Sequence, residues 1–214
     1  CWDELDEYVA EVLALASAHA DTGPEILLGI EADWMPGREA DTAAVLEAHP
    51  FDVVLGSIHM LDGWAFDDPR LRERYEEWIP DALWETYFDA LCAAAASGLF
   101  DVMAHPDLVK KFAYWPQTDP TPLYERAAEA FLSGGAAVEV NTAGARKPAQ
   151  EIYPSEAFLR VCRSAGVPAT LGSDAHSPAE VGMDLEDGVE LLRRSGYESI
   201  VIYRDRRPEE VSLP

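Results

Sequence analysis

LGSDAHSP, residues 171–178, follows an apolar run over residues 167–171, and helix-forming sequence comes soon after it. This pattern predicts a strand that ends where Asp174 and His176 stand. Strand side chains repeat every two residues, so these two would leave the backbone on the same side. A convergent carboxylate and imidazole suit a divalent metal ion, or a base held by its orienting acid. A turn with a capping Asp gives the same short pattern, so the rest of the chain has to decide.

Apolar runs of strand length alternate with helical patterns along the chain. Besides residues 167–171, strands are predicted over residues 26–30, 52–58, 100–104, 136–140 and 199–203, and helices over residues 3–18, 40–48, 80–97, 121–134, 155–166 and 185–195. Short apolar strands that alternate with helices predict parallel strands covered by helices, the α/β class. The aromatic stretch 61–81 predicts a loop, either a lid or a small insertion. The 214 residues fit one domain, residues 1–214.

Polar side chains follow the predicted strands, one strand after another. They are Glu31, His59, His105, Asn141 and the pair Asp174 and His176. Taken singly, the glutamate could cap a turn and a histidine could be a hydrogen-bonded core residue. In a barrel, however, the strand ends form one ring around one pocket, whereas an open sheet spreads them along an edge. Three of the five histidines follow this pattern, which favours a shared site.

Imidazoles and carboxylates gathered at one barrel mouth are a ligand set for zinc, manganese or iron. The set contains no cysteine thiolate, which favours hydrolytic metal chemistry over structural zinc.

Two pairs of basic residues stand out in an acidic chain. The chain has 16 Lys and Arg against 40 Asp and Glu, a formal net charge of −24. Lys110 and Lys111, like Arg146 and Lys147, lie in loops just beyond predicted strand ends. Cationic groups beside metal ions suit a phosphate oxyanion; ordinary surface charge is the alternative, above all for Lys147. Arg146 is the better candidate.

The acidic surface repels nucleic-acid phosphates and anionic lipid, so we expect neither nucleic-acid nor membrane partners. The three cysteines, Cys1, Cys92 and Cys162, are scattered and show no ligand spacing. They favour a reducing, cytoplasmic location. No stretch has the length of a membrane span or the pattern of a secretion signal.

Five segments carry a family resemblance. They are GIEAD at 29–33, LGSIH at 55–59, AHPDLVKKF at 104–112, VNTAGARKP at 140–148 and GSDAH at 172–176. With these segments the chain resembles the polymerase and histidinol phosphatase (PHP) superfamily of metal-dependent phosphoesterases. Within it, the Asn-Thr-Ala-Gly-x-Arg segment and the Lys-Lys-Phe loop are most similar to the monofunctional histidinol-phosphate phosphatases.

The resemblance implies a distorted (β/α)7 TIM-like barrel with two or three divalent metal ions at its mouth. It implies metal ligation by Glu31, His59, His105, Asp174 and His176, with catalytic proton handling by Asp174 or His176. Arg146 and one of Lys110 and Lys111 would hold the phosphate of a small phosphorylated substrate. The implied reaction is hydrolysis of L-histidinol phosphate to L-histidinol and phosphate.

One departure from the family pattern concerns its first two strands. The family opens with His-x-His and continues with Thr-Asp-His, and neither motif occurs here. We therefore expect that the first one or two βα units are missing from this chain, and that it binds metal poorly. Two alternatives stay open: a PHP-type phosphoesterase acting on a nucleotide or another small phosphate ester, and a metal-free, non-catalytic scaffold.

Overall fold

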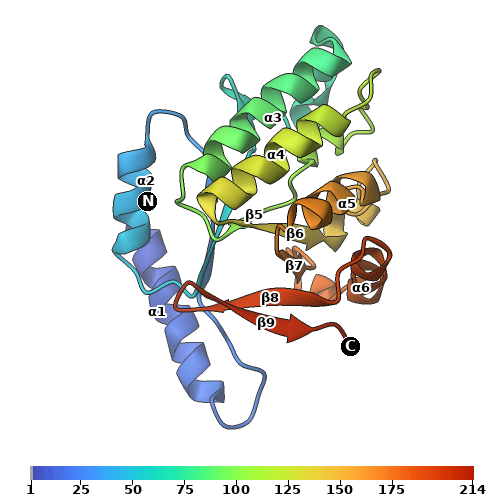
Figure 1. The fold of residues 1–214 in the computed structure, drawn as a ribbon. Helices are drawn as coiled ribbons and strands as arrows, with labels where there is room; N and C mark the ends of the chain where they lie inside the picture. Colours follow the sequence, from blue (N-terminus) through green and yellow to red (C-terminus); the bar gives the residue numbers. More distant parts are fainter. Residues whose placement is uncertain (1) are drawn as a thin grey trace.

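The computed structural model describes residues 2–214, which form a five-stranded parallel sheet and its surrounding helices (Figure 1). The strands follow the order β1-β2-β5-β6-β7, so chain neighbours are also sheet neighbours. They are β1 (Gly29–Asp33), β2 (Val53–Ser57), β5 (Val102–Met103), β6 (Ala137–Asn141) and β7 (Ala169–Gly172). The predicted α/β class with parallel strands is confirmed. A seven-stranded barrel stays a prediction, because β1 and β7 are the outer strands of this sheet.

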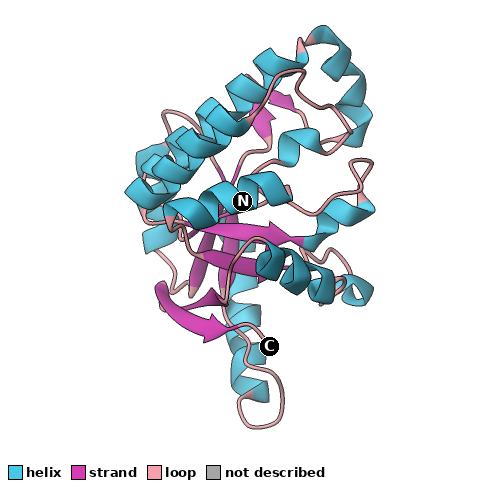
Figure 2. Cartoon of the chain, turned by 45° about the vertical axis from the view of Figure 1, so that its right-hand side comes forward, coloured by secondary structure: helices cyan, strands magenta, loops and turns pink. Residues whose placement is uncertain are grey.

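The helices lie around the strands, and α3 and α4 run side by side (Figures 1 and 2). Within residues 2–214 the α-helices are α1 (Trp2–His19), α2 (Glu39–Glu47), α3 (Pro80–Ala96), α4 (Thr121–Gly134), α5 (Glu156–Ala165) and α6 (Leu185–Arg194). Pro80 begins α3 because its fixed φ suits a first turn, whereas Gly135 and Gly166 end α4 and α5 in the left-handed conformation. None of the helices in the described range combines the length and apolarity that a membrane crossing requires.

The first strand begins three residues later than predicted. Its register is set by β2, since Gly29 lies opposite Val53 and Asp33 opposite Ser57. The preceding Leu28 is buried, but its main-chain N–H donates to the Asp52 side chain at 2.8 Å. Apolar content therefore misplaced the strand, and Glu31 lies in the middle of β1 instead of just after it.

The stretch 61–81 is a packed insertion and not an open lid. It includes most of the β3–β4 hairpin (Met60–Leu61 and Trp64–Ala65) and the 3₁₀-helix η1 (Pro69–Glu77). Trp64 and Phe66 are buried in the apolar core. The centroid of the Trp64 ring lies 5.0 Å from that of Tyr75, and Trp64 stacks on Trp78 with ring centroids 6.2 Å apart. These aromatic groups stabilise the insertion by burial, so they are not free to close over a substrate.

The strand predicted at 199–203 forms an antiparallel hairpin apart from the parallel sheet. It is β8 (Ser199–Arg204), which pairs with β9 (Arg207–Ser212). Arg206, in the hairpin turn, donates its main-chain N–H to Asp52 at 2.9 Å and contacts the Asp101 carboxylate at 3.0 Å. Because these aspartates come just before β2 and β5, the hairpin lies at the N-terminal end of the sheet, opposite the candidate site.

Cys92 and Cys162 are free thiols. Cys1 lies outside the described residues.

Candidate metal centre

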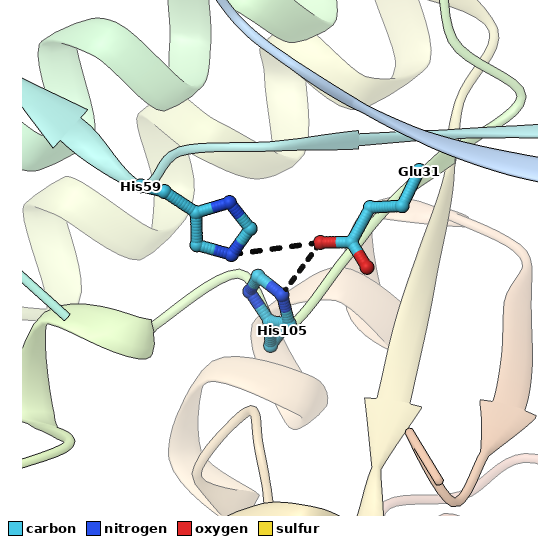
Figure 3. Close-up of side chains that lie close together, drawn as sticks. All are labelled: Glu31, His59 and His105. Atoms are coloured by element: carbon cyan, nitrogen blue, oxygen red, sulfur yellow. Dashed lines mark hydrogen bonds and ion pairs between the residues drawn. The ribbon is translucent and has the colours of Figure 1, made fainter. Parts of the chain in front are cut away.

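Glu31, His59 and His105 converge at the C-terminal end of the parallel strands (Figure 3). Nε2 of His105 lies 3.0 Å from Oε1 of Glu31, and Nε2 of His59 lies 3.6 Å from the same oxygen. One ligand atom from each residue lies within 4.8 Å of the other two. The structure thus brings together three of the five predicted metal ligands.

The strand order explains this convergence. β1, β2 and β5 are adjacent and parallel, so their carboxyl ends meet at one end of the sheet. Glu31 is the third residue of β1, His59 follows β2 by two residues, and His105 follows β5 by two. Residues 74 positions apart in the chain therefore share one hydrogen bond.

Asp33 holds the imidazole of His59 and was not predicted as a site residue. Its Oδ1 lies 2.6 Å from Nδ1 of His59 and accepts a hydrogen bond from the Ser57 hydroxyl at 3.2 Å. A hydrogen on Nδ1 leaves Nε2, which faces Glu31, as the nitrogen that can bind a metal. The sequence signal was the two-residue spacing of Glu31 and Asp33 on one strand, which places both side chains on one face.

Opposite charges dominate the electrostatics of the cluster. Burial alone would raise the pKa of Glu31, but the hydrogen bond to His105 and the charges of protonated His105 and His59 lower that pKa to about 2. Burial alone would lower the pKa of His105, but the neighbouring carboxylates, led by Glu31, raise it above its usual value. The cluster therefore favours added positive charge, which a divalent cation supplies while the imidazoles stay neutral.

The donor set fits a divalent transition metal. Two imidazoles and one carboxylate are common ligands of zinc, manganese and iron. In addition, Nδ1 of His105 is buried and has no hydrogen-bond partner within residues 2–214. An unpaired buried nitrogen of this kind marks a place where a further ligand is expected.

Asp174 borders this cluster, whereas the His176 side chain is 77% exposed. A hollow of about 340 Å³ is lined by nine residues, Leu5, Tyr8, Gly29, Ile30, Glu31, Leu55, Glu139, Asn141 and Asp174. Asp174 and His176 do not leave a strand, contrary to the prediction, but their side chains do lie together, with Nδ1 of His176 3.5 Å from Oδ1 of Asp174. β7 ends at Gly172, and Asp174 adopts a left-handed φ of 48°. Their ligand and catalytic roles stay predictions.

Glu139 is a second site residue that was not predicted. Its buried carboxylate lies in the same hollow as Glu31, on the inward face of β6. The sequence signal was a charged residue within an apolar strand, since glutamate is almost never fully buried without a partner.

Lys110 lies in the interior, in the 3₁₀-helix η2 (Leu108–Lys110), and is fully buried. Its Nζ lies 2.8 Å from Asp107 and 2.8 Å from Glu151, and donates to the Ile152 carbonyl at 3.0 Å. These partners use all three N–H donors of the ammonium group. Lys110 would have to give up one of them to bind a phosphate, which disfavours the predicted role for this lysine.

Lys111 and Arg146 keep N–H donors that no described residue accepts from. Lys111 donates to the carbonyl and carboxylate of Asp67 at 2.8 and 3.1 Å, which leaves one ammonium N–H. Arg146 lies at the end of the 3₁₀-helix η3 (Thr142–Arg146), and its guanidinium donates to the Thr142 carbonyl, the Asp184 carboxylate and the Ser173 carbonyl. Three of its five N–H donors are thus used and two are left. The Ser173 contact holds the guanidinium beside Asp174.

Comparisons with known proteins find one family and several curated relatives. The PHP domain family matches residues 3–143. A probable histidinol-phosphatase of Deinococcus radiodurans is 40% identical over 206 residues, which cover 96% of this chain and 77% of the relative. The histidinol-phosphatase of Lactococcus lactis is 22% identical, over 93% of this chain and 75% of the relative.

A solved structure shares the fold. It is the crystal structure of histidinol phosphate phosphatase from Lactococcus lactis, complexed with zinc, L-histidinol and phosphate. The superposition has a TM-score of 0.81 at 20% identity and covers 96% of this chain and 79% of the other.

Proposed function

Because this chain belongs to the PHP domain family, we propose that it is a metal-dependent phosphomonoesterase that hydrolyses L-histidinol phosphate to L-histidinol and inorganic phosphate. The observation that carries the proposal is the convergence of Glu31, His59 and His105. The substrate is supported by the 40% identity to a probable histidinol-phosphatase and by the fold shared with an enzyme that holds L-histidinol and phosphate.

Glu31, His59 and His105 would hold the first of two or three divalent ions, with Asp174 and His176 as further ligands. Zinc is the ion we propose, because the Lactococcus lactis enzyme was crystallised with it. Such an ion, when bound, lowers the pKa of a water molecule that it coordinates and polarises a phosphoryl oxygen. Asp33 orients the His59 imidazole for this role through the 2.6 Å contact to Nδ1.

Arg146 and Lys111 would bind the phosphate of the substrate. The two free N–H groups of Arg146 can pair with two phosphoryl oxygens, and its contact to Ser173 already orients it. The free N–H of Lys111 adds a further donor. Both charges would stabilise the negative charge that grows on the phosphoryl oxygens. Asp174 would take up or return a proton next to the reacting group, since it lines the same hollow as Glu31.

The test compares Arg146→Ala with Arg160→Ala, a control on the exposed face of α5 whose arginine pairs with Glu156. Phosphate release from L-histidinol phosphate is followed, with a nucleoside monophosphate as competing substrate. Loss of a charged hydrogen bond costs about 1.5–3 kcal/mol, so kcat/KM for Arg146→Ala should fall roughly 10- to 150-fold. Zinc content should stay unchanged, and Arg160→Ala should behave like the unaltered protein.

Unchanged kcat/KM in Arg146→Ala would exclude the phosphate-binding role. If the unaltered protein prefers the nucleotide, the substrate is a nucleotide and not L-histidinol phosphate.

A further inference from the structure

Glu139 is a charged residue in the middle of the buried strand β6. Strand geometry puts it on the same face of the sheet as Ala137 and Asn141. On this face Glu139 and Asn141 line the hollow that also contains Glu31. The space for its carboxylate exists because the neighbouring strand has Gly172 there. A Cβ on Gly172 would lie 2.7 Å from Oε1 of Glu139. Because Gly172 has no side chain, the Glu139 carboxylate can lie against β7 without a clash.

The hydrogen bonds that Glu139 accepts from described residues end on Oε2. This oxygen accepts the main-chain N–H of His105 at 2.8 Å and the side-chain amide of Asn141 at 3.0 Å. The Asn141 amide is itself fixed, because its oxygen accepts the main-chain N–H of Ala143. The carboxylate is thus held in one orientation, aimed at the backbone of His105.

The backbone of His105 needs such a partner. One residue earlier, the N–H of Ala104 still donates to Gly56 of β2 in the ordinary strand ladder. At His105 the chain leaves the ladder with a φ of 28°, a conformation that residues with side chains rarely adopt. The N–H of this buried residue would be an unpaired donor without Glu139.

We propose that Glu139 is a positioning residue that holds His105 in its metal-binding conformation. It replaces the missing ladder acceptor, keeps the backbone of His105 turned out of β5, and so directs the imidazole at Glu31. The role rests on the proposed metal centre, and Glu139 acts on that centre through His105 rather than through contact with substrate.

The test uses two substitutions at Glu139 that differ in reach. Glu139→Gln keeps the length and an oxygen acceptor for both N–H groups. Glu139→Asp keeps the charge but is one methylene shorter, so its carboxylate falls short of the His105 N–H. Val140→Ala is the matched control, because Val140 is fully buried on the same strand but faces away from the site.

Zinc affinity of the metal-depleted protein is measured by competition with a chromogenic chelator, and the Tm of each variant is measured in parallel. We expect Glu139→Asp to lose 10- to 100-fold in zinc affinity, the usual effect of removing a group that orients a metal ligand. Glu139→Gln should stay within about threefold of the unaltered protein, and Val140→Ala should lose Tm but keep its zinc affinity.

Each other outcome overturns the role. Zinc affinity within threefold in Glu139→Asp shows that His105 needs no such support. Losses in all three variants that follow their Tm values show a general effect on stability. If the unaltered protein binds no zinc, the metal centre and the proposed function fail together with this role, and that result is distinct from the other two.

Discussion

Replacing Lys110 by Met should strongly lower the free energy of unfolding and leave the binding of substrate unchanged. Lys110 and Asp107 are both fully buried, and their charged groups lie 2.8 Å apart. Methionine fills nearly the same volume but removes the positive charge. Asp107 would keep the Ser155 N–H, at 2.8 Å, as a hydrogen-bond partner. Glu151 is 40% exposed on its side chain and can turn to water, so it adds little to the cost.

The loss of one partner from a buried ion pair costs about 3–5 kcal/mol of unfolding free energy. With an unfolding slope of about 2 kcal/mol per M of urea, this moves the midpoint down by about 1.5–2.5 M. Lys111→Met is the matched comparison, because its pair with Asp67 is partly exposed. A partly exposed pair contributes about 1 kcal/mol or less, a midpoint shift of at most about 0.5 M.

Urea unfolding followed by circular dichroism measures both midpoints, and the KM for L-histidinol phosphate is measured on the folded variants. We expect Lys110→Met to lose stability and to keep its KM, and Lys111→Met to keep its stability and to raise its KM. The opposite division of effects, with Lys110→Met within about 1 kcal/mol of the unaltered protein, would refute the assignment of the two lysines.

Two further substitutions test the site's support and the helix packing. Asp33→Ala removes the 2.6 Å contact that orients His59, so zinc affinity in chelator competition should fall about 10- to 100-fold, and equal affinity would show that the imidazole needs no such partner. In Gly134→Ala the added Cβ would lie 1.8 Å from the Ala95 carbonyl oxygen, so α3 and α4 must separate at a cost of about 1–3 kcal/mol. That cost lowers Tm by about 2–12 °C in a scanning calorimeter, whereas Ser133→Ala, one residue earlier, should change it little; an unchanged Tm in Gly134→Ala would contradict the close packing.

Local sequence signals located the helices better than the strands. Pro80 and Gly166 mark a helix start and a helix stop by their own backbone preferences, and both ends appear where predicted. The start of β1 depends instead on pairing with β2, which sets Gly29 opposite Val53. No local pattern contains that register, so the apolar residues 26–28 predict a strand that the structure does not form there.

Some features of the site also follow from the sequence pattern, and others depend on the backbone of the folded chain. Glu31, His59 and His105 meet because successive parallel strands end at one edge, which the order of elements already implies. His176 is exposed, and it follows a strand that ends at Gly172 and a left-handed residue at Asp174, neither of which a strand pattern reveals.

The central claim is that Glu31, His59 and His105 form a metal centre, and the zinc content of the purified protein tests it most directly. Elemental analysis is performed on the unaltered protein and on His105→Ala after loading with zinc and removal of the excess. The missing His-x-His and Thr-Asp-His motifs predict poor metal binding, but the three converging ligands lead us to predict bound zinc in the unaltered protein and a clear loss of zinc in His105→Ala. Equal zinc content in the two proteins would contradict the claim.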